Sequence, residues 1–248
     1  FGVCCEALPR QVFFLTDESE FFGKGSKVVI SLLDAFFNLH GLGEKRVLLH
    51  ADNCTGQNKN NYMIQYLLWR VMNGLHDCIS LSFMIPGHTK FAPDAYFGLF
   101  KIKYRRNTTD CLRYLALCVE NASRNGYTVP QVYGKHYGLS YNTFEFREWD
   151  LFLCDYFHKI EGILNYNYFD FSRDKPGQVL LRVRHGDEPK SVFLLKKRFF
   201  RFPTPVKYPK PCSPEGLSYE RQKYLYKEIR PFVRDSSKRD ITCPEPSE

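Results

Sequence analysis

The amino-acid sequence predicts an α/β fold, and three observations carry that prediction. Short apolar runs bounded by turn residues alternate with longer segments whose apolar residues recur at helical spacing. The run Val47–Leu49 ends near an aspartate, which in such a chain is typical of a buried parallel strand. Hydrophobic residues make up 44% and charged residues 25% of the 248 residues. A chain of this kind is globular, can bury a sizeable core and forms one large or two small domains.

The N-terminal segment predicts a hairpin followed by a helix. Phe1–Glu6 and Gln11–Thr16 are strand-like runs around a turn. The acidic cluster Asp17–Glu20 could supply a metal ligand, but a turn and helix start, where acids suit the helix dipole, is favoured. Lys27–His40 carries its apolar residues on one face and is predicted to be an amphipathic helix. The preceding Gly23–Ser26 lacks P-loop spacing and is interpreted as a helix cap.

The middle of the chain predicts strand, loop, helix and strand in succession. Arg46–Asp52 is the first strand, and its aspartate lies where open α/β sheets place ligands, beyond the carboxyl end of the strand. Asn61–Asn73 is predicted to be a core-packed helix, followed by His76 as a surface or capping residue. Ile79–Ile85 is the next strand. Pro93 and Asp94 then suit the first turn of another helix.

The loop that follows Asp52 is rich in amide side chains, at Asn53, Gln57, Asn58, Asn60 and Asn61. Amides can hydrogen-bond base edges or phosphates and can order a metal-bound water. The alternative is a polar loop with Asn and Gly in turn positions. A functional role is favoured because the run directly follows Asp52. Lys59 is interpreted either as a phosphate contact or as a solvated lysine.

Two motifs in this region, read together, resemble a known family. They are A-D-N-C-T-G-Q-N-K-N (Ala51–Asn60) and I-P-G-H-T-K-F-A-P-D-A-Y-F-G-L-F-K (Ile85–Lys101). The pair resembles transposon-derived proteins of unknown function that are widespread in animals and similar to integrase or transposase cores. The resemblance is strongest over the N-terminal part of the chain. It implies a ribonuclease H-like mixed sheet flanked by helices, with an α+β accessory region.

The resemblance also implies a reaction and the residues that carry it. Such cores use three acids to hold two divalent cations, Mg²⁺ or Mn²⁺, for phosphodiester cleavage and strand transfer. Asp52 matches the second acid and Asp94 the third, while the first is expected on a strand upstream of Phe1. His88 could ligate metal or orient the leaving group. Lys90 could clamp the scissile phosphate, and a structural role is the alternative for both.

Basic residues predict a nucleic-acid partner. The net charge is +8 and the isoelectric point is near 9.0, which favours a polyanion. The segment 190–210 interleaves cations with aromatics, which suits a nucleic-acid groove, although a basic hairpin with aromatics facing the core is the alternative. The predicted contacts are Lys59, Lys90, Lys101, Lys103, Arg105, Arg106, Lys196, Lys197, Arg198 and Arg201.

The C-terminal part predicts an accessory region and a tail. The predicted elements are helices at Thr109–Ser123, Glu145–Phe157 and Tyr219–Val233, strands at Tyr166–Phe171, Val179–His185 and Ser191–Phe202, a loop-rich stretch at Tyr127–Tyr141 and a disordered tail at Asp235–Glu248. The domains predicted are a core over 1–107, an α+β accessory region over 108–202, and a Pro-rich linker with a short helix and tail over 203–248.

Cysteine usage and hydropathy indicate the compartment. The nine cysteines form no CxxC pair and no zinc-finger spacing, which is typical of reduced thiols in a reducing compartment. No signal peptide or membrane-spanning run is evident. The sequence therefore predicts an intracellular, nuclear, transposase- or integrase-like protein that binds DNA, with homo-oligomers allowed. The alternative is a catalytically inactive DNA-binding or protein-interaction protein.

Overall fold

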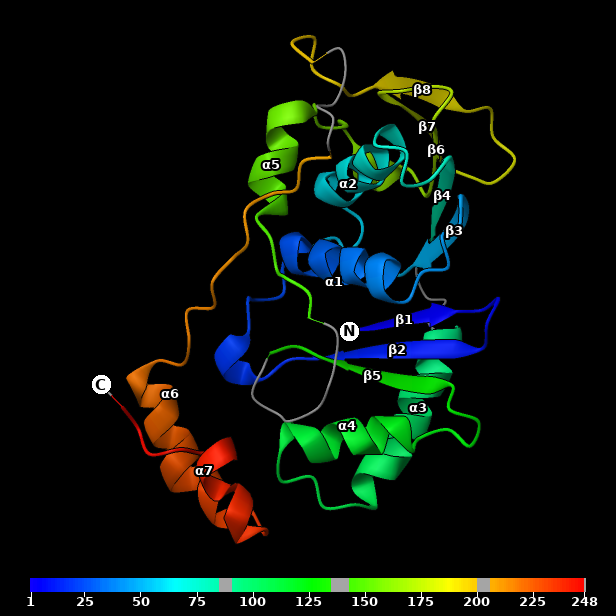
Figure 1. Cartoon of the computed structure of the whole chain (residues 1–248). Coiled ribbons are helices and arrows are strands. Elements are labelled where there is room, and N and C mark those ends of the chain that lie inside the picture. Colours follow the sequence, from blue (N-terminus) through cyan, green and yellow to red (C-terminus); the bar gives the residue numbers. More distant parts are fainter. Residues whose placement is uncertain (85–90, 135–142, 200–205, 248) are drawn as a thin grey trace. The chain divides into compact units, whose positions relative to one another are not determined.

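The computed structural model describes residues 1–84, 91–134, 143–199 and 206–247 (Figure 1). The chain divides into two compact units. Unit 1 comprises Phe1–Phe22, Lys90–Phe144 and Ser213–Glu248, and unit 2 comprises Gly23–Thr89 and Glu145–Cys212. The described residues form seven α-helices and two mixed sheets, of three and five strands. The predicted α/β class is therefore confirmed. The sequence-based division into three segments remains a prediction.

Unit 2 is built on the five-stranded sheet, whose order is β3-β4-β6-β7-β8. Only the first pair is parallel, with Val47 opposite Ile79, and the later pairs are antiparallel. Alternate residues of β4, β6 and β7 are buried, so one face of the sheet contributes to the core. The strands are β3 (Arg46–Ala51), β4 (Cys78–Phe83), β6 (Tyr168–Ser172), β7 (Gln178–Arg182) and β8 (Lys190–Phe193).

Three helices of unit 2 lie on one side of this sheet (Figure 1). They are α1 (Ser26–Leu39), α2 (Asn61–Met72) and α5 (Trp149–Tyr156). Fully buried aromatics join α2 and α5: the rings of Trp69 and Trp149 are 5.0 Å apart edge to face, and those of Tyr66 and Trp149 are 4.9 Å apart. Edge-to-face pairs of this kind add stabilisation beyond their buried area. The predicted core role of Trp69 is confirmed.

A buried polar cluster lies among the same helices. Arg70 pairs with Asp34 at 2.6 Å and donates through Nε to His76 Nε2 at 3.0 Å. The other ring nitrogen of His76 lies 2.8 Å from the Glu44 carbonyl oxygen, which assigns the proton to Nδ1. Burial lowers the pKa of His76. The predicted surface position of His76 is wrong: the residue is 3% exposed, because Arg70 needs a buried acceptor.

Strand β3 is less buried than its apolar run predicts. It is parallel to β4 as expected, but it is the end strand of the described sheet. Leu48 is 87% exposed, whereas Val47 and Leu49 are half-buried. Successive side chains of a strand point to opposite faces. Only alternate members of the run therefore face the helices, and the prediction of a strand buried on both faces is wrong.

Unit 1 is built on the three-stranded sheet, with order β1-β2-β5. Strands β1 (Gly2–Cys5) and β2 (Arg10–Leu15) are antiparallel, which confirms the predicted hairpin. Strand β5 (Thr128–Val132) pairs parallel to β2, although this stretch was expected to be loop-rich. Its Pro130 lacks an N–H and weakens the strand signal. Strand β5 forms because it pairs with β2, which lies more than a hundred residues earlier in the chain.

The helices of unit 1 follow the sequence pattern more closely. The two that precede the C-terminal segment are α3 (Ala92–Arg105) and α4 (Leu112–Glu120). Phe13 of β2 packs against Phe97 and Phe100 of α3, with ring centroids 4.9 and 5.6 Å apart. The acidic cluster forms the short 3₁₀ turn Glu18–Glu20, where Asp17 Oδ1 accepts the Ser19 N–H at 2.9 Å. The turn reading of this cluster is confirmed.

The C-terminal segment is folded against the start of α4. It contains α6 (Tyr219–Tyr224), a π turn and a 3₁₀ turn that continue it to Phe232, and α7 (Arg239–Thr242). The Asp235 N–H donates to Asp110 Oδ2 at 2.6 Å, and Thr242 Oγ1 donates to the Asp110 carbonyl oxygen at 2.5 Å. Cys243 is 1% exposed. The predicted disordered tail is therefore wrong, because these contacts order it. No described helix is long and apolar enough to cross a bilayer.

Candidate functional site at the carboxyl end of strand β3

The loop after β3, residues 52–60, closes around a single carbonyl group. The Cys54 carbonyl oxygen accepts three backbone N–H groups, from Gln57 at 3.2 Å, Asn58 at 2.7 Å and Lys59 at 3.0 Å. Three donors on one acceptor hold the backbone in a tight turn without regular secondary structure. The motif G-Q-N-K-N therefore forms an ordered, hydrogen-bonded loop.

Asn60 fixes the end of this loop to helix α2. It is the N-cap residue, and its Oδ1 accepts the Met63 N–H at 3.1 Å. Its Nδ2 donates backwards to the carbonyl oxygens of Thr55, at 3.2 Å, and Gln57, at 3.1 Å. An N-cap asparagine satisfies an N–H that the helix leaves unpaired. A single side chain thus joins the loop and the helix start.

Asp52 presents its carboxylate at the start of the loop. The side chain is exposed, and its Oδ1 accepts the Cys54 N–H at 3.0 Å and Asn58 Nδ2 at 2.7 Å. Among the described residues, no hydrogen-bond donor reaches Oδ2. Two donors on one oxygen fix the orientation of the carboxylate and leave the other oxygen toward solvent. This arrangement suits a carboxylate that is to receive a cation or a hydrogen-bond donor.

Asn53 connects the loop to the next strand. Its Nδ2 donates to the carbonyl oxygen of Met84, the residue that follows β4. Its Oδ1 is buried and has no hydrogen-bond partner in the part of the chain that the structure describes. The ends of the two parallel strands β3 and β4 are thereby held together.

Lys59 anchors the loop from inside the fold. It is only 6% exposed, its Nζ donates to Asn167 Oδ1 at 2.8 Å, and the ammonium lies 5.5 Å from the centre of the Phe83 ring. Asn167 in turn donates through Nδ2 to the Val183 carbonyl oxygen at 3.0 Å. Burial lowers the pKa of Lys59. The interpretation of Lys59 as a solvated lysine is therefore wrong. A contact between Lys59 and a phosphate would require its ammonium to leave Asn167.

The amides of the motif are mostly engaged in holding the loop. Asn58 holds Asp52, Asn60 caps α2, and the Asn61 Oδ1 accepts the Ile160 N–H at 2.6 Å. The position of Asn60 before an apolar helical run is a signal that N-cap analysis can detect. The partner Asn167 lies far along the chain from Lys59, and no local pattern predicts this pairing. Direct contact of these amides with nucleic acid or metal-bound water remains a prediction.

The second predicted catalytic acid belongs to the other unit. Asp94 belongs to unit 1, where it stands in the first turn of α3 and its Oδ2 accepts the Phe91 N–H at 3.4 Å. That contact satisfies an N–H at the helix start. A metal site shared by Asp52 and Asp94 remains a prediction. His88 and Lys90 lie outside the described residues.

The described residues do not by themselves make a metal centre. Across residues 1–84, 91–134, 143–199 and 206–247, no group of three or more His, Cys, Asp or Glu side chains is placed to hold an ion. The loop after β3 offers Asp52 and the amides around it. Hard oxygen ligands of this type suit Mg²⁺ or Mn²⁺, but one carboxylate is too few for an all-protein site.

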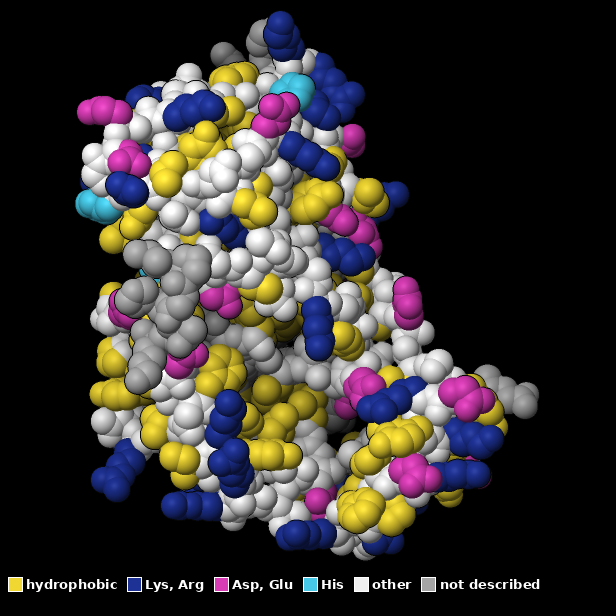
Figure 2. Space-filling view, turned by 180° about the vertical axis from the view of Figure 1, so that it is seen from behind, with side chains coloured by type: hydrophobic (Ala, Val, Ile, Leu, Met, Phe, Trp, Pro, Cys, Tyr) yellow, Lys and Arg dark blue, Asp and Glu magenta, His cyan; other side chains and the backbone are white. Residues whose placement is uncertain are grey.

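Apart from Lys59 and Lys90, the predicted nucleic-acid contacts fall into two groups with different surroundings. On the last turns of α3, Lys101, Arg105 and Arg106 are exposed and Lys103 is half-exposed. Figure 2 shows Lys and Arg side chains gathered over the region formed by α3 and α4, at its lower left.

The second group of predicted contacts follows strand β8. Lys196 Nζ donates to the Cys154 carbonyl oxygen at 2.6 Å, and Arg198 Nη2 donates to that of Asp155 at 2.8 Å. These cations therefore bind the end of α5, where carbonyl groups lack helical partners. Lys197 is exposed, and Arg201 lies outside the described residues.

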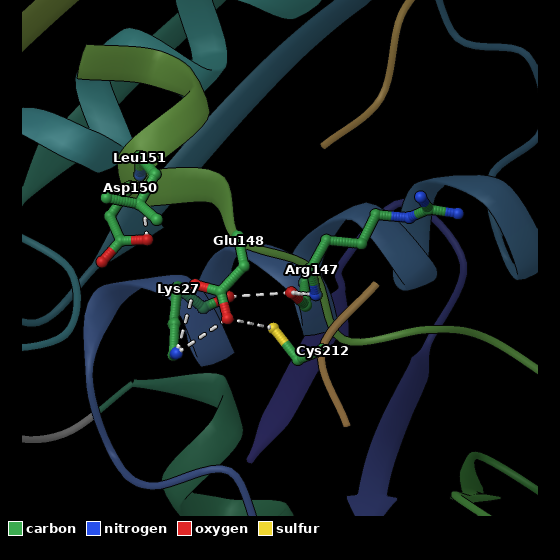
Figure 3. A network of polar contacts seen from close by, with 7 residues as sticks. Lys27, Arg147, Glu148, Asp150, Leu151 and Cys212 are labelled. Carbon is green, nitrogen blue, oxygen red and sulfur yellow. Dashed lines mark hydrogen bonds and ion pairs between the residues drawn. The ribbon is translucent and has the colours of Figure 1, made fainter. Parts of the chain in front are cut away.

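A second polar network in unit 2 surrounds Glu148, next to the start of α5. Lys27 Nζ lies 3.3 Å from a carboxylate oxygen of Glu148, and the Cys212 thiol donates to Glu148 at 3.0 Å. Figure 3 shows Glu148 between these two side chains. Burial, and to a smaller extent the nearby Glu148 carboxylate, raises the pKa of Cys212 to about 12. Cys212 is thus a protonated thiol, which is unsuited to nucleophilic attack. The network joins the start of α1, the start of α5 and the segment at Cys212.

Comparison with known proteins identifies a family without an assigned activity. The family model described as a domain of unknown function, DUF7869, matches residues 2–188. No curated protein and no solved structure matches the chain. The matched range contains the loop after β3 and helix α3, and it ends before the C-terminal segment. Because the match spans most of the sequence, the chain belongs to this family of domains of unknown function.

Proposed function

We propose that the chain acts on DNA as a transposase- or integrase-type domain of ribonuclease H-like design. The observation that supports this proposal is the presentation of Asp52. Its carboxylate stands at the carboxyl end of a parallel strand, one oxygen is fixed by two donors, and no described donor reaches the other. The carboxyl ends of parallel strands are where open α/β sheets bind ligands. The exposed cations of α3 add a surface that suits a phosphate backbone.

In this proposal Asp52 is one of several acids that hold divalent cations. Asp94 is the second candidate ligand, and His88 and Lys90 are helpers. Mg²⁺ or Mn²⁺, when bound, would activate the attacking oxygen and stabilise the leaving oxygen of a phosphodiester. The task of the chain's own residues is to orient Asp52: Asn58 holds the carboxylate, while Asn60 and Lys59 keep the loop in place.

The test is manganese-dependent nicking of a labelled duplex by the full chain, with Asp52→Asn as the decisive variant. Asp52→Asn keeps the shape of the side chain and its hydrogen bond to the loop, but removes the charge. Asp174→Asn is the matched control, because Asp174 is an exposed aspartate of unit 2 that lies outside the loop. We expect nicking by the original chain and by the control, and at least a hundredfold slower nicking by Asp52→Asn, the scale seen when an electrostatic catalytic group is removed.

A second candidate function is DNA binding without cleavage. It is favoured by the observation that the described residues contain no group of three potential metal ligands. Binding of this kind is electrostatic, so its affinity falls steeply as salt rises. Salt-sensitive binding of the duplex, with no nicking in Mn²⁺ by any of the three proteins, would establish this second candidate and exclude the first for this chain.

A further inference from the structure

A groove opens in unit 1 between the end of helix α3 and one face of helix α4. Its volume is about 270 Å³. Lys103, Asn107 and Thr108 line one wall, and Tyr114, Leu117 and Asn121 line the other. The second set recurs at intervals of three and four residues, so these side chains share one face of α4. The groove lies outside the loop after β3 and shares no residue with it.

Basic residues outnumber acidic ones among the groove lining and its direct side-chain partners. Lys103 lines the groove, and none of the lining residues is Asp or Glu. The Arg234 guanidinium of the C-terminal segment donates to Thr108 Oγ1 at 3.2 Å, which brings a second cation to the rim. Arg106, next to Asn107, is exposed. One acidic residue contacts the lining, since the Asp235 carboxylate accepts the Tyr114 hydroxyl at 2.8 Å. An anionic group is therefore the ligand type that this rim favours.

The inner surface of the groove is apolar, with two oriented amides. Leu117 is 40% exposed, and Tyr114 is held in place through its hydroxyl. Asn107 Nδ2 donates to the Lys103 carbonyl oxygen at 2.7 Å, and Asn121 Nδ2 donates to that of Leu117 at 2.8 Å. Because each amide nitrogen is bound to its own helix, both orientations are fixed. The amide oxygens remain as acceptors for a polar flat ligand.

We infer that this groove binds one nucleotide, with its phosphate against Lys103 and Arg234 and its base against Tyr114 and Leu117. The inference rests on the proposed action on nucleic acid. Cations beside an aromatic and an apolar surface are how proteins hold unpaired bases, which stack on a ring while the backbone meets positive charge. The volume is just below the range of about 300–1,000 Å³ typical of small-molecule sites, so a single nucleotide is the largest unit it takes.

The source of the nucleotide is either a single strand or the free molecule, and two probes separate these cases. A short fluorescein-labelled oligothymidylate is titrated with the full chain and followed by anisotropy. Thymidine monophosphate is titrated separately by calorimetry and is then used to displace the oligonucleotide. Binding of both probes, with displacement, assigns the groove to the nucleotide unit itself. Binding of the oligonucleotide alone, with sensitivity to the variants below, assigns it to a strand.

Two matched pairs of variants locate the binding. Lys103→Met removes the cation that lines the groove, and its control is Arg124→Met, an exposed cation of the same unit that does not line it. Leu117→Glu places a carboxylate in the groove, and its control is Leu99→Glu, which makes the same charge change on the exposed surface of α3. Both members of each pair change the net charge of the chain by the same amount. Only a groove contact distinguishes them.

We expect Lys103→Met and Leu117→Glu each to weaken binding about tenfold or more, as loss of a charged contact does, and the controls to weaken it less than threefold. Thermal unfolding of each variant separates a binding loss from a folding loss. Equal weakening by both members of each pair, or no binding of either probe, would overturn the groove assignment. Nicking of a duplex in the same preparations reports on the proposed function independently, because it depends on Asp52.

Discussion

The loop after β3 and the end of helix α3 carry polar residues for opposite purposes. In the loop, Asn58, Asn60 and Lys59 use their polar atoms on the chain itself, and Lys59 is 6% exposed. At the end of α3, Lys101, Arg105 and Arg106 are exposed to solvent. A motif rich in Asn and Lys can therefore form a scaffold around one presented group, while less distinctive cations form the surface that meets a partner.

The comparison predicts that changes in the loop alter stability and changes on α3 alter only binding. The largest loss of stability is expected for Lys59→Ala. This change removes the packed stem beside Phe83 and leaves Asn167 Oδ1 without its donor. We expect the free energy of unfolding to fall by about 2–3 kcal/mol, as for truncation of a buried side chain. Urea unfolding measures it, and Lys101→Ala is the control, for which a change within about 0.5 kcal/mol is expected.

A change in pH tests the buried cluster that supports the scaffold. Burial lowers the pKa of His76 in the folded state, so the unfolded chain takes up a proton first as the pH falls. Stability is therefore retained above the unfolded pKa of about 6.5 and is lost below it, by up to about 1.4 kcal/mol per pH unit. Unfolding curves between pH 7.5 and pH 5, roughly one unit or more on either side of that value, measure the slope. The variant His76→Gln should flatten it, and an unchanged slope would contradict the assignment of the neutral ring.

A smaller loss is expected for Asn60→Ala. The change removes the N-cap of α2 and two bonds to the loop, and caps of this kind contribute about 1 kcal/mol. Asn107→Ala is the control, because Asn107 bonds only within its own exposed helix end. Thermal and urea unfolding should both show the difference. Equal losses in the two variants would mean that the bonds from Asn60 to the loop add nothing.

The smallest effect on stability is expected for the combined change of Lys101, Arg105 and Arg106 to Gln. All three are exposed, so the free energy of unfolding should stay within about 0.5 kcal/mol per substitution. If these cations contact phosphates, each lost contact reduces the slope of log affinity against log salt by about 0.9. Anisotropy titrations of a labelled duplex at several salt concentrations measure that slope. An unchanged slope would remove this surface from the proposed interface.

Local patterns predicted much of this protein correctly. The hairpin and helices α1 to α5 follow their predicted segments closely, because hydrophobic spacing and turn residues act within one element. The candidate site was predicted in part: Asp52 is presented at a strand end as expected. The contacts that fix its loop to the rest of the fold depend on Asn167 and Met84, which flank strands β6 and β4. Spacing within the motif contains no information about those partners.

The sequence by itself determined the α/β class, the positions of most elements, and the polar loop with Asp52 at its start. Each of these depends on residues close together in the chain. Tertiary structure decided that Lys59 and His76 are buried, that Leu48 is exposed, and that the C-terminal segment is ordered. Each of these depends on a partner distant in sequence, since burial and pairing are set by which surfaces meet after folding rather than by local propensity.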